Sequence, residues 1–187
     1  MTVKSNILII GSTGRNTGKT EFACRIIEKH STQKEIIGVK VIPVDKNEVS
    51  CHRGAEGCGL CDSLTGDYEI IEEKTMDSSK DTSRMLKAGA KKVYLLIVDR
   101  NSLEKGINAI LRIIPDNALV IIESNTIRKV IEPGLFIVIK NLMNHSVKNS
   151  CVEVIEFADK IIEFNNMNWD FNPDKVSIRN KSWIIKE

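Results

Sequence analysis

The chain has 187 residues, of which 42% are hydrophobic and 28% are charged. This length predicts one domain with a sizeable buried core. The 27 lysines and arginines nearly balance the 25 acidic residues, which argues against a nucleic-acid or anionic-membrane partner. No apolar run approaches the length of a membrane span, and the first strand starts too early for a signal peptide. We therefore expect a cytoplasmic protein whose five cysteines are thiols or metal ligands and not disulfides.

The predicted elements alternate between strand and helix. The continuous apolar run Asn6–Ile10 predicts a strand buried on both faces. Apolar residues then recur at helical spacing from Lys19 to about Lys29. Further along we expect strands at Glu35–Val44, Tyr68–Glu73 and Lys92–Val98, and helices at Ser79–Ala90 and Leu103–Ile114, the last stopped by Pro115.

The last third of the chain continues this alternation. We expect strands at Asn117–Ile122 and Leu135–Ile139, a helix at Val147–Ala158, a surface loop at Asn165–Asp174, and weaker strands at Lys160–Glu163 and Ser182–Ile185. Strands that alternate with helices predict the α/β class, with a mostly parallel sheet flanked by helices. The segment 45–66 is rich in glycine and cysteine and has neither period, so it is expected to be an insertion within a single domain, 1–187.

The junction between the first strand and the first helix carries a phosphate-loop pattern, GSTGRNTGKT at 11–20. Glycines let a backbone curl around phosphate oxygens, a lysine reaches the β- and γ-phosphates, and the next hydroxyl ligates Mg²⁺. Gly18, Lys19 and Thr20 supply this ending, whereas Thr13 stands where the strict pattern has a glycine. The alternative is an ordinary glycine-rich turn with a solvated lysine. The expected nucleotide contacts are Gly14, Arg15, Asn16, Thr17, Gly18, Lys19, Thr20 and Glu21.

A nucleotide-bound Mg²⁺ also needs a carboxylate, which usually stands at the end of a neighbouring strand. Asp45, Asp99 and Glu123 each follow an apolar run, and Glu123 is the best placed of the three because its strand is expected to be fully buried. We therefore predict a magnesium site from Thr20, Asp45 and Glu123, and catalytic roles for Lys19 and Glu123. Turns are polar for general reasons, so a plain strand-exit turn is the alternative for each acid.

These motifs together resemble molybdopterin-guanine dinucleotide biosynthesis protein B (MobB), a family of small P-loop proteins of the SIMIBI class. The similarity rests on the Gly-Lys-Thr loop, the strand GVKVIPV, the segment KDTSRMLKAGAKKVYLL at 80–96, and the strand LVIIESN at 119–125. It is collinear over roughly residues 5–140. The loop is longer and poorer in glycine than that of the family, and Glu-Ser stands where the family has Glu-Gly.

The resemblance implies a P-loop fold that binds GTP with Mg²⁺ and partners the guanylyltransferase that attaches GMP to molybdopterin. It implies that Lys19 and Thr20 contact phosphate and Mg²⁺, that Glu123 is the acid beside the metal, and that Asp81 and Arg84 belong to a shared segment. A homodimer is implied in the same way. GVKVIPV and the acid-ended strand also resemble dethiobiotin synthetase, so an ATP-dependent small-molecule kinase or ligase is the alternative.

The insertion contains CHRGAEGCGLC at 51–61. Cys58 and Cys61 have the spacing of a zinc knuckle, and Cys51 or His52 would add ligands. Zinc is expected before an iron–sulfur cluster, with a redox pair or solvated thiols as the alternatives. A metal-binding module with a residual nucleotide site is therefore a third functional hypothesis. Cys24 and Cys151 lie on predicted helix faces and are expected to be core thiols.

Overall fold

The computed structural model describes residues 2–45, 64–144 and 146–186, and they form a sheet of seven strands in the order β3-β4-β2-β5-β1-β6-β7. Every neighbouring pair in this sheet is parallel except β3 with β4, which confirms the predicted mostly parallel α/β architecture. The strands are β1 (Thr2–Ser12), β2 (Ile36–Val44), β3 (Tyr68–Glu72), β4 (Lys92–Asp99), β5 (Leu119–Glu123), β6 (Ile131–Asn141) and β7 (Lys160–Phe164).

The central strands are apolar along their length because both faces of the sheet are covered. All five residues of β5 are buried, and β1 is buried from Ile7 to Ser12. β5 pairs with β1 on one side and with β2 on the other, so that Glu123 lies level with Ile10 and with Lys40. The charged residues Lys40 and Glu123 therefore sit beside each other in neighbouring strands of an otherwise apolar sheet centre.

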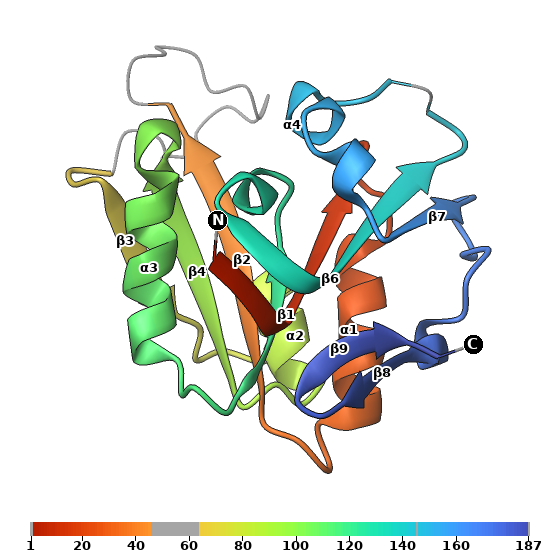
Figure 1. The fold of residues 1–187 in the computed structure, drawn as a ribbon, viewed down its shortest axis with the longest axis horizontal. Coiled ribbons are helices and arrows are strands. Elements are labelled where there is room, and N and C mark those ends of the chain that lie inside the picture. The colour runs from red at the N-terminus through yellow and green to blue at the C-terminus, as the bar shows by residue number, and fades with distance from the viewer. Residues whose placement is uncertain (1, 46–63, 145, 187) are drawn as a thin grey trace.

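Helices cover the two faces of the sheet (Figure 1). On one face lie α1 (Lys19–His30), α2 (Asp81–Lys87) and a two-stranded hairpin of β8 (Val176–Arg179) and β9 (Ser182–Ile185). On the other face lie α3 (Leu103–Ile113), the 3₁₀ turn η2 (Thr126–Lys129) and α4 (Asn149–Val152). The remaining 3₁₀ turns are η1 (Arg100–Ser102), η3 (Ile155–Phe157) and η4 (Pro173–Lys175). Figure 1 shows α4 beyond the arrowhead of β1, at the carboxyl edge of the sheet.

The prediction of one helix over Val147–Ala158 is wrong, because this segment forms α4 followed by the separate turn η3. The helix ends at Val152 with Glu153 as its C-cap, and Val154 leaves helical geometry with φ −135° and ψ −6°. Asp159 then holds the chain against the sheet, since its backbone N–H donates to the carbonyl of Phe136 and its carboxylate accepts from the Phe136 N–H. A short helix and a 3₁₀ turn thus bury Cys151 and Val154 without one continuous helix.

Two further features of the fold were not predicted. β8 was missed, and β6 begins at Ile131, four residues before the predicted start. The early part of β6 pairs with the beginning of β1 across a shift in register between Lys4 and Leu8. Gly134 allows this pairing, since a Cβ there would lie 2.1 Å from the carbonyl oxygen of Ser5.

The two predicted core thiols are buried and unpaired, as expected. Cys24 on α1 is 6% exposed and Cys151 on α4 is fully buried. Burial raises the pKa of the Cys24 thiol to about 12, so it stays protonated at neutral pH. None of the helices in the described part of the chain has the length and apolar character that crossing a bilayer requires.

Candidate functional site

The carboxyl edge of the sheet opens into a cleft of about 1330 Å³. The loop between β1 and α1 forms one wall, and Asn144 with residues 146–150 forms another. Ligands of open α/β sheets bind at this edge because the loops that follow parallel strands converge there. All eight predicted nucleotide contacts, from Gly14 to Glu21, line the cleft. The structure therefore brings these residues together at a place suited to a ligand.

The start of the loop is clamped by the side chain of Asn125, which follows β5. Its amide oxygen accepts a hydrogen bond from the Ser12 N–H at 2.8 Å, and its amide nitrogen donates to the Ser12 carbonyl at 2.9 Å. Gly11 leaves room for this clamp, because a Cβ there would lie 2.5 Å from the amide oxygen of Asn125. The exit of the buried strand is thus fixed by two hydrogen bonds from the neighbouring strand's turn.

Thr13 takes a conformation that does not require glycine. Within the loop, only Asn16 and Gly18 have positive φ angles, 53° and 71°. Thr13 is 2% exposed, and its N–H donates to the carbonyl of Ile139 at 3.0 Å. Its carbonyl accepts a hydrogen bond from the Lys148 N–H at 2.9 Å. The residue that departs from the strict motif therefore extends the pairing of β1 with β6, and the loop turns later.

The Lys19 ammonium lies inside the curve of the loop. It donates to the Ser12 hydroxyl at 2.7 Å and to the Gly14 carbonyl at 3.5 Å. Burial lowers the pKa of Lys19 to about 8, with the positive charges of Lys40 and Lys148 contributing and the charge of Glu123 opposing. A buried ammonium with a depressed pKa is poised to gain from an incoming anion, because an anion restores the charged form.

A lysine and two carboxylates from three separate elements meet beside Lys19. The Lys40 ammonium of β2 lies 2.6 Å from Oδ2 of Asp81 on α2 and 2.5 Å from Oε2 of Glu123 on β5. Burial favours neutral Lys40, but the two carboxylates together outweigh it and raise its pKa. Desolvation would likewise raise the pKa of Asp81, but Lys40 and a hydrogen bond from Thr20 lower it. The cluster is therefore a charged network.

Two side-chain oxygens at the site are buried without a hydrogen-bond partner among the described residues. Glu123 is 1% exposed, and its Oε1 has no donor while its Oε2 contacts Lys40. The Oγ1 of Thr17 is also buried without a hydrogen-bond partner, and this residue is 1% exposed. An unsatisfied buried polar group costs about 1–3 kcal/mol, so each of these two oxygens calls for a partner such as water, an ion or a ligand.

The lining of the cleft has an excess of positive charge. Of the described residues that line it, six are lysine or arginine and three are aspartate or glutamate. Arg84 at the rim pairs with Glu21 at 2.5 Å, and Glu21 also contacts Arg25. Asp45 lines the cleft at the end of β2, as predicted, whereas the Asp99 carboxylate accepts from the Asn101 N–H and holds η1. The field of the cleft favours an anion.

Sequence reasoning placed Asp81 only through a resemblance and missed Lys40 and Asn125. The signal for Lys40 was present, since it is the one charged residue in the apolar run from Ile36 to Val44. No pattern in the sequence indicated that Asn125 reaches back to Ser12.

The predicted zinc ligands Cys51, His52, Cys58 and Cys61 lie outside the described residues. Within residues 2–45, 64–144 and 146–186 there is no group of three or more His, Cys, Asp or Glu side chains that would hold a metal ion. The predicted magnesium site is of a different kind, because it combines a hydroxyl and carboxylates with phosphate oxygens.

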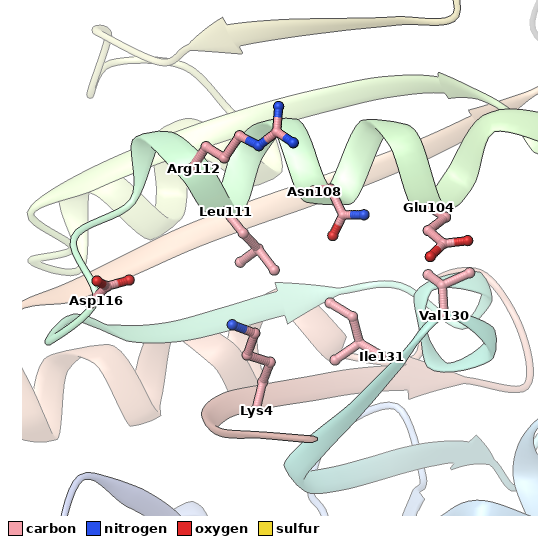
Figure 2. Close-up of a pocket in the computed structure, with 8 residues that line it drawn as sticks. All are labelled: Lys4, Glu104, Asn108, Leu111, Arg112, Asp116, Val130 and Ile131. Carbon is pink, nitrogen blue, oxygen red and sulfur yellow. The ribbon is translucent and has the colours of Figure 1, made fainter. Parts of the chain in front are cut away.

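A second, smaller cavity of about 560 Å³ lies between α3 and the beginnings of β1 and β6 (Figure 2). Figure 2 shows Leu111 and Ile131 within it and charged side chains around it. The positive charges of Lys4 and Arg112 are balanced there by Glu104 and Asp116, so this cavity lacks the excess of positive charge found in the larger cleft.

Comparisons with known proteins leave the site to be interpreted from its own chemistry. No protein-family model, no curated protein and no solved structure matches the chain.

Proposed function

We propose that the chain binds a magnesium–nucleoside triphosphate, GTP or ATP, in a P-loop and hydrolyses it slowly. The observation that carries this proposal is the partly buried Lys19 ammonium, held by Ser12 and Gly14 of its own loop at the mouth of a cation-rich cleft. A solvated lysine in an ordinary turn would not be buried or have its pKa depressed.

The start of α1 supports the same proposal. This helix is 12 residues long, and its N-cap Gly18 provides no side-chain hydrogen bond to the first turn. The first N–H groups of a helix have no intrahelical acceptor, and the helix dipole adds positive potential there. Phosphate oxygens would accept from these N–H groups, with Lys19 beside them.

The acidic residues of the cleft fit a magnesium ion. Thr20, Asp81 and Glu123 offer a hydroxyl and carboxylates in one cluster, and Asp45 lies at the same edge of the sheet. The unpartnered Oε1 of Glu123 is a buried oxygen that a cation would satisfy. When bound, Mg²⁺ would neutralise charge on the phosphate oxygens. Lys19 would stabilise the charge that develops during hydrolysis, and Glu123 would hold the cation side of the site.

Replacement of Lys19 by methionine tests the proposal. We expect wild-type protein to bind Mg·GTP or Mg·ATP with micromolar affinity in isothermal titration calorimetry. Lys19→Met is expected to weaken binding about 100-fold, because it removes a charge-assisted contact worth about 2–3 kcal/mol. Lys34→Met removes a lysine from the exposed loop after α1 and should bind like wild type. Equal affinity of Lys19→Met and wild type would refute a P-loop.

The depressed pKa of Lys19 predicts that nucleotide affinity depends on pH. Burial shifts this pKa down to about 8, so the ammonium is about nine-tenths charged at pH 7 and about one-tenth charged at pH 9. Since phosphate binds the charged form, the dissociation constant should rise roughly tenfold between pH 7 and pH 9. Titrations at pH 7, 8 and 9 measure this slope. Lys34→Met should retain it, and a flat profile in the wild type would contradict the assignment.

The biological role that we propose is a MobB-like accessory role in molybdenum-cofactor or related cofactor biosynthesis. In this proposal a cytoplasmic protein, in the homodimer that the resemblance implies, uses the nucleotide to control contact with a partner enzyme. Zinc or an iron–sulfur cluster at residues 51–61 remains part of the proposal. Metal analysis of the purified chain and of a Cys58→Ser/Cys61→Ser variant would test that part.

The size of the cleft favours a second candidate function, an ATP-dependent small-molecule kinase or ligase. Its volume of about 1330 Å³ exceeds the roughly 300–1000 Å³ typical of a site for one small molecule. The extra room would take an acceptor, and Asn144 and Ser150 are among the polar residues that line the cleft. An acceptor that raises nucleotide turnover by orders of magnitude would favour this function over slow hydrolysis.

A further inference from the structure

The side chain of Lys40, which lines the cleft, lies between two carboxylates. The Lys40 ammonium lies 2.6 Å from Asp81 Oδ2 and 2.5 Å from Glu123 Oε2. The Asp81 carboxylate also accepts a hydrogen bond from Thr20. The ammonium therefore stands between oxygens contributed by β5 and α2, and Thr20 of α1 adjoins the same Asp81 carboxylate.

This set of oxygens suits a divalent cation better than it suits an ammonium. Magnesium and manganese prefer oxygen ligands, and Mg²⁺ is usually held by one or two carboxylates together with water and phosphate oxygens. Lys40 leaves Oε1 of Glu123 without a partner, although this side chain is fully buried. The unsatisfied oxygen is a second observation, beside the ion pairs, that leaves room at this carboxylate for a further partner.

Lys40 has room to leave these carboxylates. Its side chain is 19% exposed and lines the cleft, whereas Glu123 is fixed in the sheet with no side-chain exposure. The four-carbon stem of a lysine can swing its ammonium toward the open cleft without a change in β2. A divalent ion and the ammonium would repel each other if both stayed between the same two oxygens.

We propose that Lys40 is an internal counter-ion that exchanges with a divalent cation. In the nucleotide-free chain it neutralises Asp81 and Glu123 and keeps a divalent ion out. When a metal–nucleotide complex enters, Lys40 turns to the phosphate oxygens and the metal takes its place. The nucleotide step of this exchange rests on the proposed function. The exchange makes metal and nucleotide binding mutually dependent, because the phosphates draw Lys40 away from the carboxylates and the metal releases Lys40 to the phosphates.

The test measures Mn²⁺ binding without nucleotide, by electron paramagnetic resonance of the free ion. The wild type should bind Mn²⁺ weakly, and Lys40→Met should bind it at least about tenfold more tightly, because the carboxylates lose their internal cation. Lys87→Met removes the same charge from an exposed position on α2 and should leave Mn²⁺ affinity unchanged. Adding Glu123→Gln to Lys40→Met should abolish the gain.

A second variant guards against failure of Lys40→Met to fold. Lys40→Gln keeps an N–H donor for the carboxylates and should also gain Mn²⁺ affinity. The exchange is overturned if neither variant binds Mn²⁺ more tightly than the wild type, or if Lys87→Met gains as much. Normal nucleotide binding with no gain in Mn²⁺ affinity would reject the exchange alone. A gain in Mn²⁺ affinity in a chain that binds no nucleotide would leave the carboxylate site standing and reject the P-loop function.

Discussion

Lys40→Met is expected to lower the free energy of unfolding by about 3–5 kcal/mol in metal-free buffer, because it removes the cation from a buried ion pair. The Glu123 side chain is completely buried, and Lys40 is its only hydrogen-bond partner among the described residues. The variant would leave one carboxylate oxygen as unsatisfied as the other already is. Urea denaturation followed by circular dichroism measures the loss.

A double variant separates the charge from the packing. Glu123→Gln in the Lys40→Met background removes the uncompensated charge, so more than half of the lost stability should return. Lys87→Met, on the surface of α2, should change stability by no more than ~0.5 kcal/mol. A cost below ~1 kcal/mol for Lys40→Met would mean that the pair contributes little beyond a solvated contact.

Gly134→Ala is expected to destabilise the chain by about 3 kcal/mol, because β6 and β1 approach too closely there for a side chain. The added Cβ would lie 2.1 Å from the Ser5 carbonyl oxygen and 2.8 Å from its carbonyl carbon. Both are backbone atoms within β1, so they cannot move aside without breaking pairing on either side of the register shift between Lys4 and Leu8. Thermal unfolding should show the loss as a lower midpoint.

The control for this effect is Gly66→Ala. Among the described residues, a Cβ at Gly66 would meet only the Tyr68 carbonyl oxygen, at 3.8 Å, and the φ angle of Gly66 is not in the left-handed region. The free energy of unfolding of Gly66→Ala should stay within ~0.5 kcal/mol of the wild-type value. Equal midpoints for the two variants would show that the strands separate at Gly134 at little cost.

The sequence predicted the strands that are buried on both faces because their signal is local. Asn6–Ile10 and Asn117–Ile122 read as continuous apolar runs, and the structure places them side by side in β1 and β5. The early part of β6 was not predicted, since the sequence Pro133-Gly134 is typical of a turn that interrupts a strand. They are tolerated because the register shift in β1 changes the pairing at this point.

The candidate site was predictable only where its residues are neighbours in the sequence. The Gly-Lys-Thr ending indicated a phosphate loop, and the structure gathers residues 14–21 at one cleft. The cluster of Lys40, Asp81 and Glu123 depends instead on strand order. β5 lies between β1 and β2 in the sheet although it follows both in the sequence, and this order brings Glu123 beside Lys40. The spacing of residues along the chain does not encode that order.

The place of β1 in the sheet has a consequence for how the chain folds. β1 precedes both of its partners in the sequence and lies between β5 and β6, with Ile7 opposite Val120 and Ile9 opposite Phe136. An emerging chain therefore has an apolar strand without its final partners until β5 and β6 have been made. Pairing over such long sequence separations is slow and leaves strand edges open to aggregation. Chaperone binding to the nascent chain should accordingly end only after residue 141 has left the ribosome.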